Sequence, residues 1–256
     1  MSAPEQASAP ASAPASAIVL SVVVPVRNEA PNVLPLIAEI EAALAAIPHE
    51  IVIVDDGSTD ATPERVAEAE AAGAPLVRRR HRIACGQSAA VATGVLAAHA
   101  ALIATLDGDG QNDPADIPAL LDRMTAEAAS GGRPILIAGH RTTRRDTAIK
   151  RAGSRIANRV RAGLLRDATP DTGCGLKLFA RAAFLDLPRF DHMHRFLPAL
   201  FIRAGGRVVS VPVGHRPRAA GRSHYGTLDR LAVGLVDLAG VFWLQRRRLL
   251  PEVEAP

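Results

Sequence analysis

Short apolar runs rich in β-branched residues alternate with longer amphipathic segments along most of the chain. The apolar runs predict buried strands at residues 18–26, 50–56, 74–79, 100–107 and 133–141. Helical patterns are predicted between and after them, at residues 31–47, 60–72, 86–100, 114–129 and 147–165. Because strands that alternate with helices form right-handed crossovers, we expect an α/β fold with a mainly parallel central sheet flanked by helices.

Polar residues follow three of the predicted strands at the point where each strand ends. The segment Pro25 to Glu29 ends the first strand, Asp55 and Asp56 end the second, and "LDGDG" ends the fourth. In open parallel sheets, ligands bind beyond the carboxyl ends of the strands. We therefore expect these three segments to meet on one rim of the sheet.

The acidic character of this rim limits its ligands. Carboxylates do not attract phosphate, but they can hold a divalent cation that binds phosphate, or accept hydrogen bonds from a base and a ribose. An Asp-x-Asp pair at a strand end suits Mg²⁺ or Mn²⁺, which prefer oxygen ligands. Neither GxGxxG after the first strand nor GxxxxGK[ST] is present, so the dinucleotide fingerprint and the P-loop are excluded. An acidic turn by itself is commonly just solvated, whereas three polar strand ends together indicate a site.

Composition and charge narrow the choice of partner. The 256 residues are 48% hydrophobic, enough for one sizeable core, and the formal net charge is +4. Lys and Arg gather in residues 140–166 and 202–248, which indicates a basic surface that faces an anionic partner. Only 3% of residues are aromatic, which argues against stacking on single-stranded nucleic acid, so we expect no nucleic-acid partner. Two cysteines fit a reducing, cytoplasmic location.

The two ends of the chain differ from its middle. Residues 1–17 form a Ser/Ala/Pro tail without the apolar content to fold and without the apolar core of a signal peptide. We therefore expect one domain over 18–225 and an amphipathic C-terminal helix over 226–248. Its apolar run, 231–244, is shorter than the roughly 20 residues that span a bilayer.

The predicted C-terminal helix has two open interpretations. We expect its apolar stripe, opposite Asp237, to consist of Leu231, Leu235, Leu238, Phe242 and Trp243. The stripe either packs on the domain's own sheet or lies on a membrane. Because Arg246, Arg247 and Arg248 follow the apolar end, we favour peripheral binding to an anionic membrane surface, on its cytoplasmic face.

Three motifs together resemble the signatures of family 2 glycosyltransferases with the GT-A fold: "VVVPVRNEAPNV", "IVIVDDGSTDAT" and "TLDGDGQNDPADI". The later stretch, from "DTGCGLKLFARAAF" to "RAAGRSHYG", resembles the polyprenyl-phosphate branch, which includes dolichyl-phosphate mannose synthases and bacterial undecaprenyl-phosphate sugar transferases. The resemblance covers residues 18–244. It implies a metal-dependent, inverting enzyme that moves a sugar from a UDP- or GDP-sugar to a polyprenyl phosphate.

The resemblance also implies residues for the donor. Pro25, Arg27 and Glu29 correspond to the segment that lines the nucleotide, and Asp55 to the aspartate that hydrogen-bonds the base. Asp56 is expected either to form an Asx-turn with the two residues after it or to contact the donor directly.

The Asp-x-Asp motif corresponds to the metal site. Asp107 and Asp109 match the aspartate pair, Asp107 also as a donor-binding residue and Asp109 also as a catalytic residue. Gln111 matches a third ligand of Mg²⁺ or Mn²⁺. Asp113 precedes Pro114 and is instead predicted to cap the following helix.

The acceptor phosphate would be bound by basic residues in the second half of the chain. By resemblance these are Arg141, which is also expected to be catalytic, together with Lys150, Ser154, Arg218 and Ser223. His224 stands where the family usually has Lys. His192, His194 and Arg195 are expected near the acceptor or behind the site, and Cys174 as a packing residue. An acceptor phosphate is already an oxyanion at neutral pH, so no strong general base is required.

Two alternatives stay open at this point. A saccharide or another lipid as acceptor would call for a catalytic carboxylate in the second half, where Asp171 and Asp191 are the candidates. A non-catalytic module that binds a nucleotide sugar or a membrane would share the fold without the chemistry. The complete set of Asp107, Asp109 and Gln111 argues against such a module.

Overall fold

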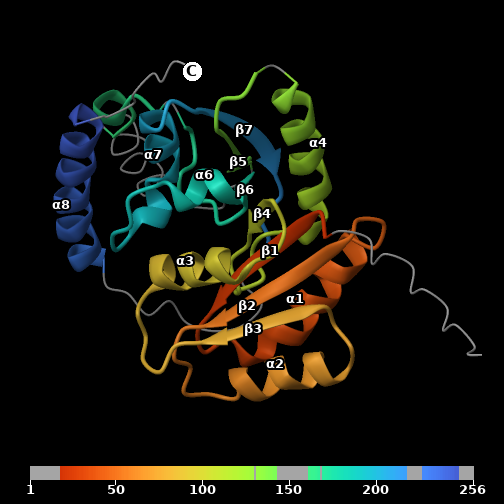
Figure 1. The fold of residues 1–256 in the computed structure, drawn as a ribbon. Helices are drawn as coiled ribbons and strands as arrows, with labels where there is room; N and C mark the ends of the chain where they lie inside the picture. The colour runs from red at the N-terminus through yellow and green to blue at the C-terminus, as the bar shows by residue number, and fades with distance from the viewer. Residues whose placement is uncertain (1–17, 130, 143–160, 168, 218–226, 248–256) are drawn as a thin grey trace, which may run out of the picture.

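The chain folds around a single seven-stranded sheet (Figure 1). The computed structural model describes residues 18–129, 131–142, 161–167, 169–217 and 227–247, and for 227–233 only the path of the helix. The strands are β1 (Leu20–Val26), β2 (His49–Asp55), β3 (Leu76–Arg80), β4 (Leu102–Thr105), β5 (Ile135–Arg141), β6 (Lys177–Ala180) and β7 (Arg207–Val213). Their order across the sheet is β3-β2-β1-β4-β6-β5-β7.

Most strand pairs are parallel, which confirms the predicted α/β class. The exception is β6, which runs antiparallel to both β4 and β5. Neither β6 nor β7 is predicted from the sequence. Four residues are too few for a clear periodicity in β6. In β7, Pro212 interrupts the alternating pattern, and the strand tolerates it because β7 lies at the edge of the sheet.

Alternation along the strands divides the core between the two faces of the sheet. Val22 and Val24 point to one face, and Val23 points to the other. The first face is covered by α1 (Ala30–Ala43), α2 (Thr62–Ala71) and α4 (Ile117–Ala128), the last preceded by the 3₁₀ turn η1 (Pro114–Asp116). The second face is covered by α3 (Gln87–Ala97), α6 (Arg181–Leu185), the 3₁₀ turn η2 (Met193–Arg195), α7 (Leu197–Arg203) and α8 (Thr227–Arg246). The domain is therefore a three-layer α/β/α sandwich.

The strand order places a crevice beside β1. The chain moves outward from β1 to β2 and β3, and then returns to β4 on the other side of β1. Crossovers that leave in opposite directions open a space at the carboxyl ends of the two strands, where ligands bind in such sheets. Helix α3 packs closely against β1 next to this crevice. Glycine is needed at position 94 of the helix, because an added Cβ there would lie 2.3 Å from Cγ1 of Val23.

Helix α8 packs against the domain with a different face from the predicted one. Leu238 and Phe242 lie against the second core, as does the fully buried Val241. Asp237 also faces inward, where its carboxylate pairs with Nδ1 of His192 at 3.0 Å. Leu235 and Trp243 instead face outward and are 60% and 59% exposed. The predicted single stripe opposite Asp237 was therefore wrong: it divides between the inner and the outer side of the helix.

Several predicted elements and boundaries lie outside the described residues. These are the tail at 1–17 and most of the basic helix predicted at 147–165, of which residues 161–165 are described and are helical. The separation of 18–225 from 226–248 as two units stays a prediction. No helix among the described residues is both long and apolar enough to cross a bilayer.

Candidate active site

The loops after β1 and β2 are joined by a set of hydrogen bonds. Asn28, in the left-handed region at φ 54°, accepts a bond of 2.8 Å from the Thr59 amide through its side chain. Its own amide donates to Ser58 Oγ at 2.9 Å. Asp60 connects the first turns of two helices, because it accepts from the amides of Thr62 and Ala30. The predicted nucleotide-lining segment and the "DDGSTD" turn therefore form one unit.

Asp55 and Asp56 have different surroundings, and the side-chain hydrogen bond within the turn is made by the first of them. Asp55 Oδ1 accepts from the Ser58 amide at 2.9 Å, and its Oδ2 pairs with Nε of Arg80 at 3.0 Å. Of the two alternatives left open for Asp56, the Asx-turn is therefore wrong. A side chain at a turn can bond to the amide three residues on as well as two, and the sequence does not distinguish which aspartate does so.

Asp56 instead holds the loop that leads into α3. Its two oxygens accept from the amides of Cys85 and Gly86 at 2.7 and 2.8 Å, and Oδ1 also contacts Nδ1 of His81 at 2.8 Å. Burial acts to raise the pKa of Asp56, but these hydrogen bonds outweigh it and lower the pKa below its usual range. The ligand atoms of Asp56, His81 and Cys85 lie within 4.8 Å of one another. Because backbone amides already occupy both oxygens of Asp56, we assign this group to holding the loop.

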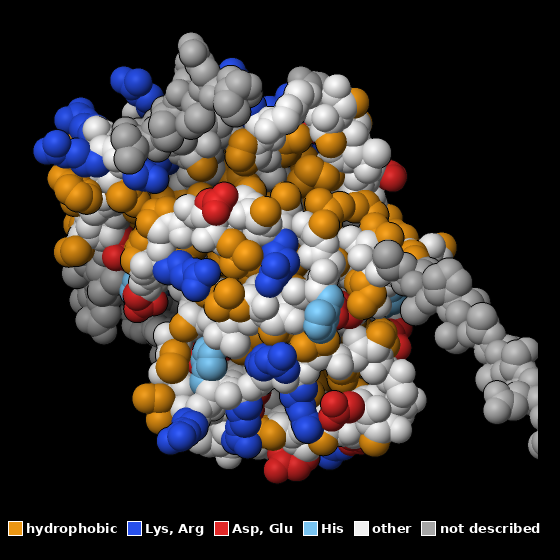
Figure 2. Space-filling view, viewed as in Figure 1, with side chains coloured by type: hydrophobic (Ala, Val, Ile, Leu, Met, Phe, Trp, Pro, Cys, Tyr) orange, Lys and Arg blue, Asp and Glu red, His pale blue; other side chains and the backbone are white. Residues whose placement is uncertain are grey.

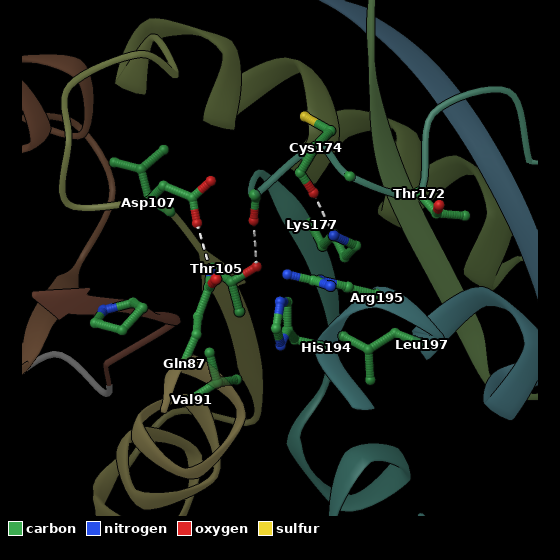
Figure 3. A pocket seen from close by; sticks show the side chains of 14 residues that line it. Gln87, Val91, Thr105, Asp107, Thr172, Cys174, Lys177, His194, Arg195 and Leu197 are labelled. Atoms are coloured by element: carbon green, nitrogen blue, oxygen red, sulfur yellow. Dashed lines mark hydrogen bonds between the residues drawn. The ribbon is translucent and has the colours of Figure 1, made fainter. Parts of the chain in front are cut away.

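The loop before α3 connects the two groups of aspartates. Gln87 follows Gly86, and its Nε2 donates to Oδ1 of Asp107 at 2.7 Å (Figure 3). Gly86 has φ 90°, a conformation that glycine adopts without strain. Sequence reasoning did not single out Gln87. A glycine directly before a helix, followed by an amide side chain, is the local signal for it.

Asp107 and Asp109 lie close enough to repel one another. Burial raises the pKa of Asp107, and the nearby charge of Asp109 raises it further. Asp109 Oδ1 also accepts from the Gln111 amide at 3.1 Å, which draws the third predicted ligand into the same turn. Two crowded carboxylates and a neighbouring amide carbonyl form an all-oxygen donor set, and such a set fits Mg²⁺ or Mn²⁺.

The "GCG" segment lies directly against Asp107. A Cβ added to Gly175 would lie 2.2 Å from Cγ of Asp107, so only glycine leaves room for the carboxylate there. Thr105 Oγ1 donates to the Gly175 carbonyl at 2.7 Å and fixes the distance between β4 and this segment. Cys174 is fully buried, and burial raises the pKa of its thiol, in keeping with the predicted packing role.

Arg141 ends β5 on the other side of the same segment. Its Nε and Nη2 donate to the two carboxylate oxygens of Asp171 at 2.6 and 2.8 Å, and Asp171 is 4% exposed. A Cβ on Gly173 would lie 3.3 Å from Nη2 of Arg141. The three-residue segment 173–175 therefore separates Arg141 from Asp107.

The segment after β7 returns to the turn formed by residues 107–111. The amide of Arg216 donates to the Gln111 carbonyl at 2.9 Å, and its guanidinium pairs with Asp113 at 2.6 Å and Glu39 at 2.7 Å. Asp113 also accepts from the Ala115 amide, which confirms it as the predicted cap. Arg218, Ser223, Lys150 and Ser154 lie outside the described residues, as do His224 and Arg248.

A cavity of about 230 Å³ opens beside Asp107, between α3, β6 and η2 (Figure 3). Gln87 and Asp107 line one side, and Lys177, His194 and Arg195 line the other (Figure 3); Pro25 also belongs to the lining. Ser88 bonds to Nδ1 of His194 at 2.7 Å and so joins η2 to α3. Burial, with the charge of Arg195, lowers the pKa of His194 to about 3, so this imidazole is neutral at physiological pH. Sequence reasoning assigned no role to Lys177.

The predicted site residues are therefore brought together only in part. Pro25, Asp55, Asp56 and Asp107 lie on one rim at the strand ends, and Asp109, Gln111 and Arg141 lie beside them. Arg27 is exposed at the end of β1, and Glu29 accepts from Asn32 Nδ2 at 2.5 Å at the start of α1. The specific roles of these residues toward a nucleotide stay predictions.

Comparison with known proteins identifies relatives of this architecture. The chain is 32% identical over 232 residues to dodecaprenyl-phosphate galacturonate synthase of Rhizobium johnstonii, covering 88% of this chain and 66% of the relative. It is 31% identical to undecaprenyl-phosphate 4-deoxy-4-formamido-L-arabinose transferase of Aeromonas hydrophila, covering 87% of this chain and 67% of the relative. The chain thus spans about two thirds of the length of these proteins.

Solved structures share the fold. Glucosyl-3-phosphoglycerate synthase from Mycobacterium tuberculosis, in complex with Mg²⁺ and UDP, superposes with a TM-score of 0.63 at 20% identity, over 91% of this chain and 80% of that one. The same protein in complex with UDP gives a TM-score of 0.63 at 19% identity, over 91% and 81%. The family model described as glycosyl transferase family 2 matches residues 21–187, which hold β1 to α6 and the Asp-x-Asp turn. With its GT-A-like sheet, this chain belongs to the family 2 glycosyltransferases.

Proposed function

We propose that this enzyme transfers a sugar from a nucleoside-diphosphate sugar to a polyprenyl phosphate, with inversion at the anomeric carbon. The observation that carries the proposal is the position of Arg141. It lies across the segment 173–175 from Asp107, so that a cation for an acceptor phosphate and a metal site for a donor diphosphate are neighbours. The names of both relatives include a polyprenyl-phosphate acceptor.

The donor would bind along the rim of β1, β2 and β4. We assign Pro25, Arg27 and Glu29 to the nucleotide and Asp55 to its base, as the family resemblance implies. Asp107, Asp109 and Gln111 would hold Mg²⁺ or Mn²⁺, which neutralises the charge that develops on the departing diphosphate. The crowding of the two aspartates supports this assignment, because a divalent cation relieves their repulsion.

The acceptor needs orientation more than deprotonation. A phosphate monoester is already an oxyanion at neutral pH, so its oxygen attacks without a strong base. Arg141 would grip this phosphate, because guanidinium binds phosphate in well-defined geometry. Asp171 aligns the guanidinium from behind through two hydrogen bonds. Attack from the face opposite the diphosphate would invert the anomeric centre.

The alternative of a saccharide acceptor would require a free carboxylate as general base. Asp171 is occupied by Arg141, which leaves Asp191 of the two sequence candidates. The Asp191 side chain is 68% exposed and lies near Gly86, before α3. No other observation favours this acceptor, so we keep the polyprenyl phosphate.

A polyprenyl acceptor lies in a membrane, and α8 offers a surface for one. Leu235, Val236 and Trp243 are 60%, 73% and 59% exposed on its outer side. Figure 2 shows hydrophobic side chains along this outer edge, and Lys or Arg side chains at its upper end, where Arg246 and Arg247 lie. Apolar residues next to basic ones suit the cytoplasmic surface of an anionic membrane. We propose peripheral contact there.

Release of nucleoside diphosphate tests the function directly. Purified enzyme is given UDP- or GDP-sugars, with and without a polyprenyl phosphate, and with Mn²⁺ or excess chelator. We expect release that requires both the lipid phosphate and the cation. Asp109→Asn should abolish turnover and Asp107→Ala should weaken donor binding. Full activity in excess chelator would contradict the metal assignment, and release that is stimulated only by saccharides would favour the alternative acceptor.

A further inference from the structure

The cavity beside Asp107 is lined by two basic side chains on the side away from the turn formed by residues 107–111. Lys177 rises from β6 and is buried, and Arg195 extends from η2 into the same space (Figure 3). Lys177 Nζ donates to the Cys174 carbonyl. Arg195 has no ion pair and no side-chain hydrogen bond to any described residue. A guanidinium is rarely left without an acceptor in such a partly enclosed space.

The neighbouring acids act on Lys177: burial lowers its pKa, and the charges of Asp107 and Asp171 both oppose that lowering. Asp171 is engaged by Arg141, and Arg141 does not line the cavity. Asp107 lines the opposite side of the cavity, where it accepts a hydrogen bond from Gln87 of α3 and lies near the charge of Asp109. His194 is neutral and adds no charge. Among the described residues, the guanidinium of Arg195 is therefore the cation of this wall that is left for a ligand to balance.

Size and position indicate which part of a substrate would meet this wall. A cavity of about 230 Å³ is smaller than the roughly 300–1,000 Å³ that hold drug-sized ligands. It suits a single sugar ring and is too small for a whole nucleotide sugar. The ring would lie beside Asp107, close to where a metal would hold the diphosphate to which the sugar is attached.

Resting on the proposed function, we propose that the transferred sugar carries a carboxylate, as a hexuronate does, and that Arg195 binds it with Lys177 alongside. A guanidinium binds a carboxylate through two parallel hydrogen bonds, and the cavity walls would shield the pair from water. The neutral His194 is then available to a sugar hydroxyl. A sugar with a hydroxymethyl group in place of the carboxylate would leave Arg195 unpaired, which makes Arg195 a specificity-determining residue.

Matched donors test this without using the acceptor. Calorimetry with Mn²⁺ compares UDP-glucuronate with UDP-glucose and UDP-galacturonate with UDP-galactose. GDP-mannuronate is compared with GDP-mannose in the same way. In each pair the sugars differ only in carboxylate against hydroxymethyl. We expect one acidic donor to bind at least tenfold more tightly than its neutral partner. Neutral donors that bind as tightly as every acidic one overturn the proposal.

Substitution of Arg195 tests whether the preference for acidic donors arises in this cavity. Arg195→Gln should weaken binding of the acidic donor by about 10- to 150-fold, the range for a charge-assisted hydrogen bond, and change the neutral donor by less than about twofold. Arg195→Lys should recover part of the loss. Arg189→Gln, an exposed arginine outside the cavity, is the control. Thermal melts of all variants establish that they fold.

A lipid-phosphate titration separates this proposal from the proposed function. If Arg195→Gln raises the KM for the polyprenyl phosphate and leaves the affinity for acidic donors unchanged, Arg195 binds the acceptor phosphate and the carboxylate assignment is overturned. If wild-type enzyme prefers acidic donors in calorimetry and yet turns over without any lipid phosphate, the acceptor assignment fails and the sugar assignment stands.

Discussion

Asp171 binds Arg141 side-on, with Nε and Nη2 of the guanidinium donating to its two oxygens at 2.6 and 2.8 Å. Both side chains are largely buried, at 5% and 15% exposed. Thirty residues separate them in the chain, and the segment between them includes the basic helix predicted from the sequence. The pair therefore sets the direction of the predicted acceptor-binding arginine before any substrate arrives.

Removal of Asp171 should affect both stability and the lipid step. Asp171→Ala leaves a buried guanidinium unpaired, which costs about 3–5 kcal/mol, measured as the free energy of unfolding in urea. The KM for polyprenyl phosphate should rise while donor affinity changes little. The double variant Arg141→Met/Asp171→Leu should regain much of the stability without regaining lipid transfer. Recovery of transfer in that double variant would show that Arg141 does not bind the acceptor.

Gly175→Ala should disable the metal site without unfolding the protein. Its Cβ would lie 2.2 Å from Asp107 Cγ, so the carboxylate must turn away from its position beside Asp109. We expect metal-dependent turnover to fall at least about tenfold, in line with the displacement of one well-placed group. The Mn²⁺ concentration needed for half-maximal turnover should rise. Gly132→Ala, with nothing within 4 Å of the added Cβ, is the matched control. Equal Mn²⁺ dependence in both variants would show that a side chain at position 175 does not displace the Asp107 carboxylate.

His194 should make the enzyme less stable in acid. Burial, with the charge of Arg195, lowers its folded-state pKa from 6.5 to about 3. Between those pH values the unfolded chain binds a proton that the native state does not, so stability falls as pH falls through this window. The slope is at most about 1.4 kcal/mol per pH unit. Urea unfolding of His194→Gln should show a shallower decline from pH 6.5 downward, and parallel profiles would refute the assignment.

The outer side of α8 should control membrane binding. Leu235→Ser/Trp243→Ser removes exposed apolar surface, and Arg246→Ser/Arg247→Ser removes about 1 kcal/mol of attraction per residue to an anionic leaflet. We expect the arginine variant to bind anionic vesicles about thirtyfold less tightly in sedimentation, and 1 M salt to have a similar effect on the wild type. Leu96→Ser, at a 50% exposed leucine on α3, is the control. Neutral vesicles that sediment the wild type equally well would oppose an electrostatic role.

Local pattern was sufficient for much of the fold and for the position of the acidic residues at the rim of the sheet. Each of the five predicted strands is present. Four of them contain a continuous apolar run, as expected for strands that are buried on both faces, and β3 begins with two apolar residues before its arginines. Asp107 and Asp109 follow such a run directly, so their place at the rim follows from the order of strands and helices. Asp113 could likewise be predicted as a cap from the proline after it.

Side chains that meet from distant parts of the chain could not be predicted in this way. The inner face of α8 is set by His192, which pairs with Asp237 and turns that carboxylate inward. The inner and outer apolar residues of this helix are spaced alike in the sequence. Only packing against α7 and the pairing of Asp237 with His192 distinguish them.

The sequence by itself determined the α/β alternation, the family motifs and the acidic turn after β4, because all of these depend on neighbours within a few residues. The tertiary structure alone decided that β6 runs antiparallel between β4 and β5. It also decided that Asp171 accepts hydrogen bonds from the Arg141 guanidinium, and that Gly175 leaves room for the Asp107 carboxylate. It also brought Ser88 to His194 across 106 residues and so closed the cavity that holds Arg195. The physical reason is that these contacts depend on which surfaces are buried together, and burial depends on the whole chain rather than on any single segment of it.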